Sequence, residues 1–332
     1  MSRRVTWKRG MRLTSEIFNT MESSHLESAR MAVSVASAGR CGLFGAADDF
    51  SVSVNVDNGI AETVELRCVG VTASGKIVDL DIRPESATNP DTRVSIPAGH
   101  EDEAFLLTVR LMEEWREIDE LRSEECYRFE LVREGGSLGP DSLPVGRIVN
   151  RFGWRLDETD FVPPCLYVHS HPTLMAQAAR ARQMAEALAE MCLASPECVA
   201  RSLTGRVWSA ASRLRNALDC EIQTIAPETF LVLVRGLVGE FIIGCSADSH
   251  VSLENPEPYV DYMRGVWDAG HVSRDIERGL ALCAEIRGKM EVVCTMTEEA
   301  PQAPERPARK AQPKAAPEEP HHRRKGWEGL EI

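Results

Sequence analysis

The chain has 332 residues, which is enough for two domains with separate hydrophobic cores. A hydrophobic content of 43% excludes a wholly disordered chain. The formal net charge of −13 argues against a general nucleic-acid-binding protein, because neutralising phosphates requires clustered Lys and Arg side chains. We therefore expect no nucleic acid among its partners.

Residues 1–37 are predicted to form an extended arm followed by a helix. Thr14 or Ser15 is suited to cap the helix, and Glu16 would lie in its first turn, where a carboxylate favours the helix dipole. The start of the arm is positively charged but has no apolar region behind it, so we expect no secretory signal. The apolar side chains that would share one helix face are Ile17, Met21 and Leu26.

From residue 50 the apolar side chains recur with a period of two, which indicates strands. The alternating residues 52–56 stop at Asp57-Asn58-Gly59, a hairpin turn signal, and a second pair of strands flanks Ala73-Ser74-Gly75. Further alternation occurs near residues 105–111, 127–131 and 148. Short strands without a long helix between them predict an antiparallel β-sandwich or a barrel-like domain over residues 38–171 of an α+β chain, and we take the sandwich.

At Pro172 the period becomes helical, and breaks at Ser195-Pro196, Pro227 and Glu254-Asn255-Pro256 divide the region into four helices. We therefore predict a four-helix bundle over residues 172–297. The last of these helices would run through Val260, Met263, Ile276, Leu280 and Cys283. The expected bundle or oligomer seam comprises Leu174, Ala178, Ala181, Met184, Leu188 and Met191, and the stripe of Met184 with Met191 is also suited to pack on another protomer.

Residues 298–332 differ in composition from the rest of the chain. Many Pro, Ala, Glu, Lys and Arg residues predict a disordered tail. The tail ends in HHRRKGWEGLEI, a basic cluster followed by the apolar side chains Trp327, Leu330 and Ile332. A solvated terminus is the simpler interpretation of this end, and a short docking peptide is the functional one.

Two compositional features bear on the cellular environment. The most apolar helix candidate, residues 230–245, contains Arg235 and Glu240, which favours a core helix over a membrane span. The ten cysteines form no C-x-x-C pair, so we expect neither a zinc site nor a disulfide scaffold. We predict reduced thiols that act as small apolar fillers in a cytoplasmic protein.

Two motifs suggest an enzyme, but each lacks the context that its chemistry requires. Gly70–Lys76 has the spacing of a phosphate-binding loop, but Ile77 occupies the position of the magnesium-binding Ser or Thr, and strands are predicted on both sides. Gly135–Gly139 matches the G-x-S-x-G nucleophile motif around Ser137, but Pro140 and another strand follow it where a helix is needed. We expect no catalytic residues and no enzymatic activity.

Two histidines stand where the strand pattern gives way to the helical one. Leu166, Val168 and Ser170 alternate with Tyr167, His169 and His171, which predicts a strand with both imidazoles on one face. Pro172 suits the first position of the next helix, with His171 or Ser170 as its cap. The pattern allows a metal site or a structural junction, and we favour the junction, with no metal and no cofactor.

Two segments carry a resemblance to a known family. Trp7-Lys8-Arg9-Gly10-Met11-Arg12-Leu13, continuing to Phe18, resembles the opening W-x-x-G-[AM]-x-L-x-P-x-x-F of the TssK-type baseplate proteins of bacterial type VI secretion systems. Phe161–Leu166, continuing through Ser170, Pro172, Leu174 and Met175, is similar to the family's passage from the β-rich shell into the helical bundle. Pro227-Glu228, near the start of the predicted third helix, also resembles this family. Ser15 and Glu16 depart from the family's usual Pro-Gln.

The resemblance implies a non-enzymatic, cytoplasmic adaptor at the inner-membrane-proximal baseplate. It implies a homotrimer that binds wedge proteins of the baseplate. The arm residues Trp7, Gly10, Met11, Leu13 and Phe18 would contact a neighbouring subunit or a wedge protein, and ordinary core packing is the alternative. Family members usually continue into a C-terminal head that contacts the membrane complex, and here a Pro-rich tail stands in its place. We expect Trp327, Leu330 and Ile332 to link to a membrane-complex protein or another component instead.

Two other classes of function stay open at this point. A phage-derived module would bind carbohydrate or a receptor through exposed aromatic side chains, of which Trp115 and Trp154 are the main candidates in a chain with 6% aromatic residues. A hydrolase built on Ser137 ranks third.

Overall fold

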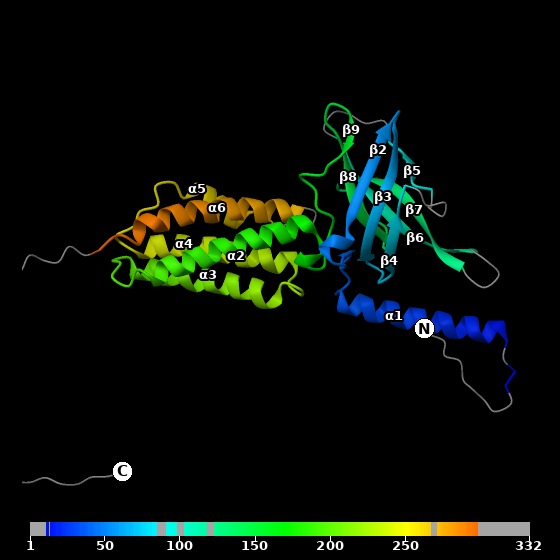
Figure 1. Ribbon diagram of the computed structural model, residues 1–332, viewed down its shortest axis with the longest axis horizontal. Helices are drawn as coiled ribbons and strands as arrows, with labels where there is room; N and C mark the ends of the chain where they lie inside the picture. Colours follow the sequence, from blue (N-terminus) through cyan, green and yellow to red (C-terminus); the bar gives the residue numbers. More distant parts are fainter. Residues whose placement is uncertain are drawn as a thin grey trace, which may run out of the picture. The chain divides into compact units, whose positions relative to one another are not determined.

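The computed structural model describes residues 11–12, 14–84, 91–97, 103–117, 123–266 and 271–297 (Figure 1). Antiparallel sheets occupy the first half of this chain and helices the second, so the predicted α+β fold class is confirmed. The predicted tail lies outside the described residues, as do Trp7, Gly10 and Leu13 of the predicted arm.

Helix α1, Ser15–Ala36, begins at the predicted capping signal. The Thr14 hydroxyl accepts a hydrogen bond from the Ile17 N–H at 3.4 Å, and Glu16 lies in the first turn. The chain leaves the helix through Gly39, whose φ of 71° is accessible to glycine without strain. Ser24 is the one buried side chain of α1.

The first sheet has a central strand, β3, that pairs antiparallel with each of the other four. Its strands are β1 (Gly42–Leu43), β2 (Ser51–Asp57), β3 (Ile60–Val71), β4 (Ile77–Ile82) and β5 (Arg93–Ser95), and a 3-10 turn, η1 (Ala47–Asp49), lies between β1 and β2. Asn58 and Gly59 both have positive φ, 50° and 75°, as the predicted hairpin turn requires.

The second sheet has the strand order β7-β6-β8-β9, with every pairing antiparallel. Its strands are β6 (Ala104–Glu117), β7 (Ser123–Arg133), β8 (Ser142–Asn150) and β9 (Trp154–Leu156). Strand β8 is almost completely buried, whereas β2 and β9 each lie at an edge of their sheet. The two edge strands lie side by side (Figure 1).

Side chains from both sheets share one core, which makes the domain a sandwich. Leu66 and Val78 of the first sheet are buried in the same cluster as Leu107, Val109 and Leu143 of the second. The sheets approach closely at Gly70, where an added Cβ would lie 2.5 Å from Leu143 Cδ2. A glycine is therefore required there by packing rather than by phosphate binding.

The predicted strand over residues 166–171 is wrong. Cys165 forms a single bridge with Leu43, and residues Val168–Ser170 form a 3-10 turn, η2. Strand β1 offers only two residues for pairing, and Pro163 and Pro164 have no N–H to donate. The chain therefore turns toward the bundle, and the Val168 N–H donates to the Ile225 carbonyl at 2.9 Å.

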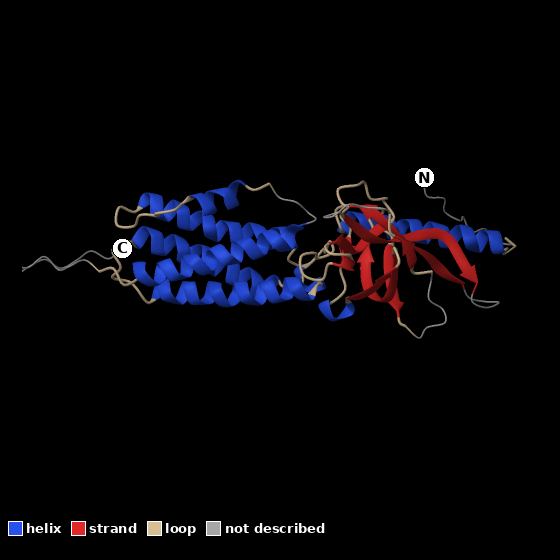
Figure 2. Ribbon diagram, turned by 90° about the horizontal axis from the view of Figure 1, so that it is seen from above, coloured by secondary structure: helices blue, strands red, loops and turns tan. Residues whose placement is uncertain are grey.

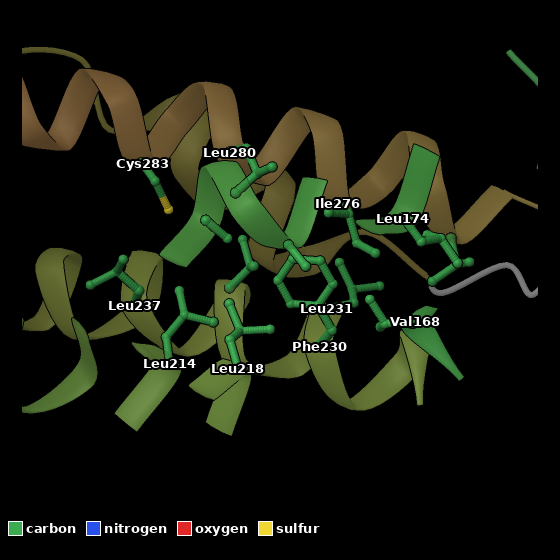
Figure 3. Close-up of a cluster of buried hydrophobic side chains, with 14 of the residues drawn as sticks. Val168, Leu174, Leu214, Leu218, Phe230, Leu231, Leu237, Ile276, Leu280 and Cys283 are labelled. Atoms are coloured by element: carbon green, nitrogen blue, oxygen red, sulfur yellow. The ribbon is translucent and has the colours of Figure 1, made fainter. Parts of the chain in front are cut away.

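The helical part contains four long helices that pack around one core (Figure 2). They are α2 (Pro172–Leu193), α3 (Arg201–Glu221), α4 (Pro227–Ala247) and α6 (Val272–Val293). Each packs on two others, with contacts α2–α3, α3–α4, α4–α6 and α6–α2. The core side chains from these helices converge in Figure 3 and include Leu174, Leu214, Phe230, Leu237 and Ile276.

The predicted fourth helix is two helices. Val260 and Met263 belong to α5 (Glu257–Arg264), and Ile276, Leu280 and Cys283 belong to α6. Helix α5 ends at Gly265, whose N–H donates to the Asp261 carbonyl at 3.0 Å. Met263 and Ile276 are 13 residues apart, about 3.6 turns of a helix, so their side chains would lie on different sides of one continuous helix. Together with Gly265, this change of phase is the signal in the sequence for the break.

Helix α4 is the one helix in the described ranges that is long and apolar enough to cross a membrane. Its residues Phe230, Val234, Leu237 and Phe241 are fully buried against the other helices. In this structure α4 is a bundle helix, as the sequence analysis predicts.

Candidate interaction surfaces

The glycine-lysine motif forms a structural contact between two loops of the sandwich. Lys76 is only 7% exposed, and its Nζ lies 2.8 Å from Asp141 Oδ2, while the Ser74 hydroxyl donates to the other carboxylate oxygen. Burial alone would raise the pKa of Asp141, but the hydrogen bonds from Lys76 and Ser74 and the charges of Lys76 and Arg110 outweigh it and lower the pKa. The cation that a phosphate would need is already neutralised.

Ser137 lies in the loop between β7 and β8, where its side chain is exposed. Strand β8 follows the loop, so no helix N-terminus supports an oxyanion there. The geometry of a nucleophile elbow is not formed around Ser137.

His171 caps helix α2. Its Nδ1 accepts a hydrogen bond from the Thr173 N–H at 3.2 Å, and its ring centroid lies 5.0 Å from that of Phe50 in the sandwich. Burial lowers the pKa of His171 from 6.5 to about 4, which keeps the ring neutral and able to accept this bond. The side chain therefore joins the sandwich to the first bundle helix.

His169 points to a different set of neighbours. Its ring stacks on Tyr167 with centroids 5.5 Å apart, and burial lowers its pKa against an opposing hydrogen bond with the Gln223 backbone. Across the described ranges, no three His, Cys, Asp or Glu side chains are grouped as a metal site would need. The two histidines act in the junction through packing and capping.

All ten cysteines are free thiols, and six of them are buried. Burial raises the pKa of Cys283 to about 12, so this thiol stays protonated and packs as a small apolar group. Cys220 departs from the predicted filler role because it is exposed on α3.

The predicted seam residues lie on α2. Leu174, Ala178, Ala181 and Leu188 are buried within the chain's own bundle, and Met184 and Met191 are half-buried against the same core. Small side chains at these positions let α2 and α3 pack closely.

Helix α1 presents apolar side chains to solvent along its length. Phe18 is 46% exposed and Val35 is 76% exposed, and Leu26 and Met31 are exposed between them. Of the other predicted arm residues, Met11 is described and half-buried. Large exposed Phe and Met side chains are typical anchors at protein interfaces.

Two polar contacts join the sandwich to the bundle. Arg40 Nη1 lies 3.3 Å from Glu228 Oε2 at the start of α4. His271 Nε2, at the start of α6, lies 3.6 Å from Glu134 Oε1. The other carboxylate oxygen of Glu134, Oε2, lies 2.8 Å from Arg147 Nη2. Arg147 in turn holds the buried carboxylate of Asp157 at 2.7 Å.

The hairpin between β8 and β9 carries an unusual aromatic side chain. Phe152 is fully exposed and has a φ of 59°, in the left-handed region that a bulky residue rarely adopts. Trp154, a candidate anchor for carbohydrate, is instead half-buried, with its ring centroid 5.5 Å from that of Phe105. The side chain of Trp115 lies outside what the structure describes.

Sequence comparison identifies no relative: no protein-family model and no curated protein matches the chain. Comparison with solved structures finds proteins of similar fold. The crystal structure of TssK has a TM-score of 0.56 and 14% identity, covering 86% of this chain and 69% of that chain. This chain has the TssK fold. A chain in the cryo-electron microscopy structure of the type VI secretion system TssK-TssF-TssG baseplate subcomplex has a TM-score of 0.56 and 16% identity, covering 87% of this chain and 99% of that one.

The TssK fold confirms the resemblance that the sequence motifs indicated. The second match covers 87% of this chain, which is more than the sandwich or the bundle alone. Phe152 is not among the residues that the sequence pattern singles out. The signal for it in the sequence is an aromatic residue in a three-residue hairpin loop between two strands.

Proposed function

We propose that this chain is a structural subunit of a type VI secretion baseplate. The observation that carries the proposal is the shared fold over 86% of this chain with TssK and over 87% with a chain of the baseplate subcomplex. The motif residues that suggest an enzyme instead make structural contacts, as Lys76 does with Asp141. Because a fold alone does not fix a function, the proposal depends on partner binding.

The partners proposed are wedge proteins of the TssF and TssG kind, together with further copies of this chain in a homotrimer. The wedge-binding surface comprises the arm residues Trp7, Gly10, Met11, Leu13 and Phe18, continued by the exposed apolar residues of α1. In the cell the assembly would lie in the cytoplasm, on the side of the baseplate that faces the inner membrane. The seam of α2 would stiffen each subunit within the trimer.

A binding experiment tests this surface. The full-length chain is mixed with the TssF-type and TssG-type proteins of the same bacterium, and complexes are separated by size-exclusion chromatography. We expect wild type to co-elute with the wedge proteins and Phe18→Asp to bind at least about 10-fold more weakly, as loss of an apolar interface anchor does. Leu193→Asp is the control, because Leu193 is also an exposed apolar residue, 71% exposed against 46% for Phe18, and lies at the end of α2. Equal binding by both variants would remove α1 from the surface.

We also propose that Trp327, Leu330 and Ile332 link the subunit to a membrane-complex protein or another component. Residues 1–297 form one unit by their internal contacts, so truncation after Thr297 leaves the folded part intact. The truncated chain is expected to bind wedge proteins normally while secretion is lost. Unchanged secretion would contradict the link.

A further inference from the structure

An apolar hollow lies where the sandwich meets the first helix of the bundle. Its volume is about 230 Å³, and its wall includes Phe50, Val145 and Phe161 of the sandwich and His171 at the start of α2. Val145 and Phe161 are buried, and Phe50 is half-buried. Because an apolar cavity of about 150 Å³ can hold benzene, this hollow has room for one aromatic ring with a substituent of a few atoms.

His171 provides an unused hydrogen-bond donor in this wall. With its pKa lowered to about 4 by burial, the ring is neutral, and its Nδ1 accepts from the Thr173 N–H, so Nε2 carries the proton. No group in the described ranges accepts that proton. Nε2 is also not among the fully buried polar atoms without a partner, so it borders open space, and the hollow is the space that the ring lines. A buried N–H in this position favours a ligand that brings an acceptor.

The carboxylates of the wall decide against a charged ligand. Asp157 is already bound, by Arg147 Nη1 at 2.7 Å and by the Asp160 N–H at 3.0 Å. Glu158 is exposed at the rim and has no ion-pair partner in the described part of the chain. Two carboxylates repel an anion, and an ammonium ion would leave the Nε2 donor of His171 without an acceptor. The wall therefore fits a neutral molecule with an apolar ring and one oxygen.

We propose that the hollow binds a small neutral aromatic molecule of the phenol type, with its ring against Phe50 and Phe161 and its oxygen accepting a hydrogen bond from His171 Nε2. Such a ligand contacts both the sandwich and the first helix of the bundle, so its binding stabilises the junction between them. The inference goes beyond the baseplate function and does not depend on it.

Three molecules with the same ring test the chemistry of the hollow in the full-length chain. Phenol has a neutral oxygen, toluene has no acceptor, and benzoate is an anion. In ligand-observed NMR titrations we expect phenol to saturate one site per chain with a dissociation constant of about 1 mM or lower. Toluene and benzoate should each bind at least about 10-fold more weakly, because one lacks the hydrogen bond and the other meets the carboxylates.

Two variants on the same strand locate the site. Val52→Phe places a ring in the hollow and should abolish phenol binding. Val54→Phe is the matched control, because Val54 is also a half-buried residue of β2 but lines a neighbouring hollow instead. It should bind phenol as wild type does.

The donor is tested by His171→Leu, which should bind phenol and toluene equally, with circular dichroism to check that the variant is folded. The ratio of the two affinities isolates the hydrogen bond from any loss of stability at the helix cap. The inference is overturned if phenol binding survives Val52→Phe, if wild type binds toluene or benzoate as tightly as phenol, or if no saturable phenol binding occurs up to about 10 mM.

Discussion

Gly279→Ala probes the packing of the short helix α5 on the bundle. A Cβ at Gly279 would lie 2.1 Å from Tyr262 Oη and 2.6 Å from Val234 Cγ1. Both neighbours are buried, and the guanidinium groups of Arg235 and Arg278 lie 5.3 and 5.9 Å from the centroid of the Tyr262 ring. The ring has no open space to move into, so α5 must shift to accept the methyl group.

The magnitude follows from a comparison with Gly288→Ala in the same helix. A Cβ at Gly288 meets nothing within 4 Å. Both substitutions gain about 1 kcal/mol of helix propensity, so this gain cancels in the comparison. The difference between the variants is the cost of overpacking, about 1–3 kcal/mol, with Gly279→Ala the less stable.

Urea unfolding followed by far-UV circular dichroism measures both variants. We expect Gly288→Ala to unfold at higher urea concentration than wild type and Gly279→Ala at a lower one than Gly288→Ala. Equal stability of the two variants would refute the contact between Tyr262 and Gly279, and with it the placement of α5.

Two further predictions concern the sandwich and its junction with the bundle. His171→Asn keeps a capping acceptor but does not titrate. Because burial lowers the pKa of His171 to about 4 in the folded state, the unfolded state binds the proton first as the pH falls below 6.5. Wild type should therefore lose about 2 kcal/mol between pH 7 and pH 5 that the variant keeps, measured by urea unfolding at both pH values; parallel losses would contradict this. Arg147→Met leaves the buried Asp157 carboxylate unpaired and should cost about 3–5 kcal/mol in unfolding free energy, against about 0–1 kcal/mol for Arg151→Met, whose pair with Asp160 is exposed.

Local chemistry predicts the elements of this fold well where the determining contacts are close in sequence. The hairpin turn is predictable because Asn58 and Gly59 both tolerate the positive φ that such a turn requires. The start of α1 is predictable because the Thr14 side chain is a good helix cap. Apolar and polar residues do alternate over 166–171, but alternation alone does not make a strand. The partner strand, β1, is only two residues long, so the segment forms a 3-10 turn instead. The break between α5 and α6 has a signal in the sequence, because Met263 and Ile276 are out of phase for one continuous helix.

The interaction surfaces are harder to predict because they depend on contacts between distant residues. The role of Lys76 becomes clear only when the fold brings Asp141, 65 residues away, beside it. Phe152 looks like an ordinary loop residue in the sequence, and only the structure shows its full exposure and its φ of 59°.

Co-elution of the full-length chain with TssF-type and TssG-type proteins, with the absolute mass measured by light scattering across the peak, tests the central claim most directly. The baseplate account predicts one complex that contains the wedge proteins and three copies of this chain. A chain that elutes alone as a monomer, beside a wedge complex of unchanged mass, would contradict it.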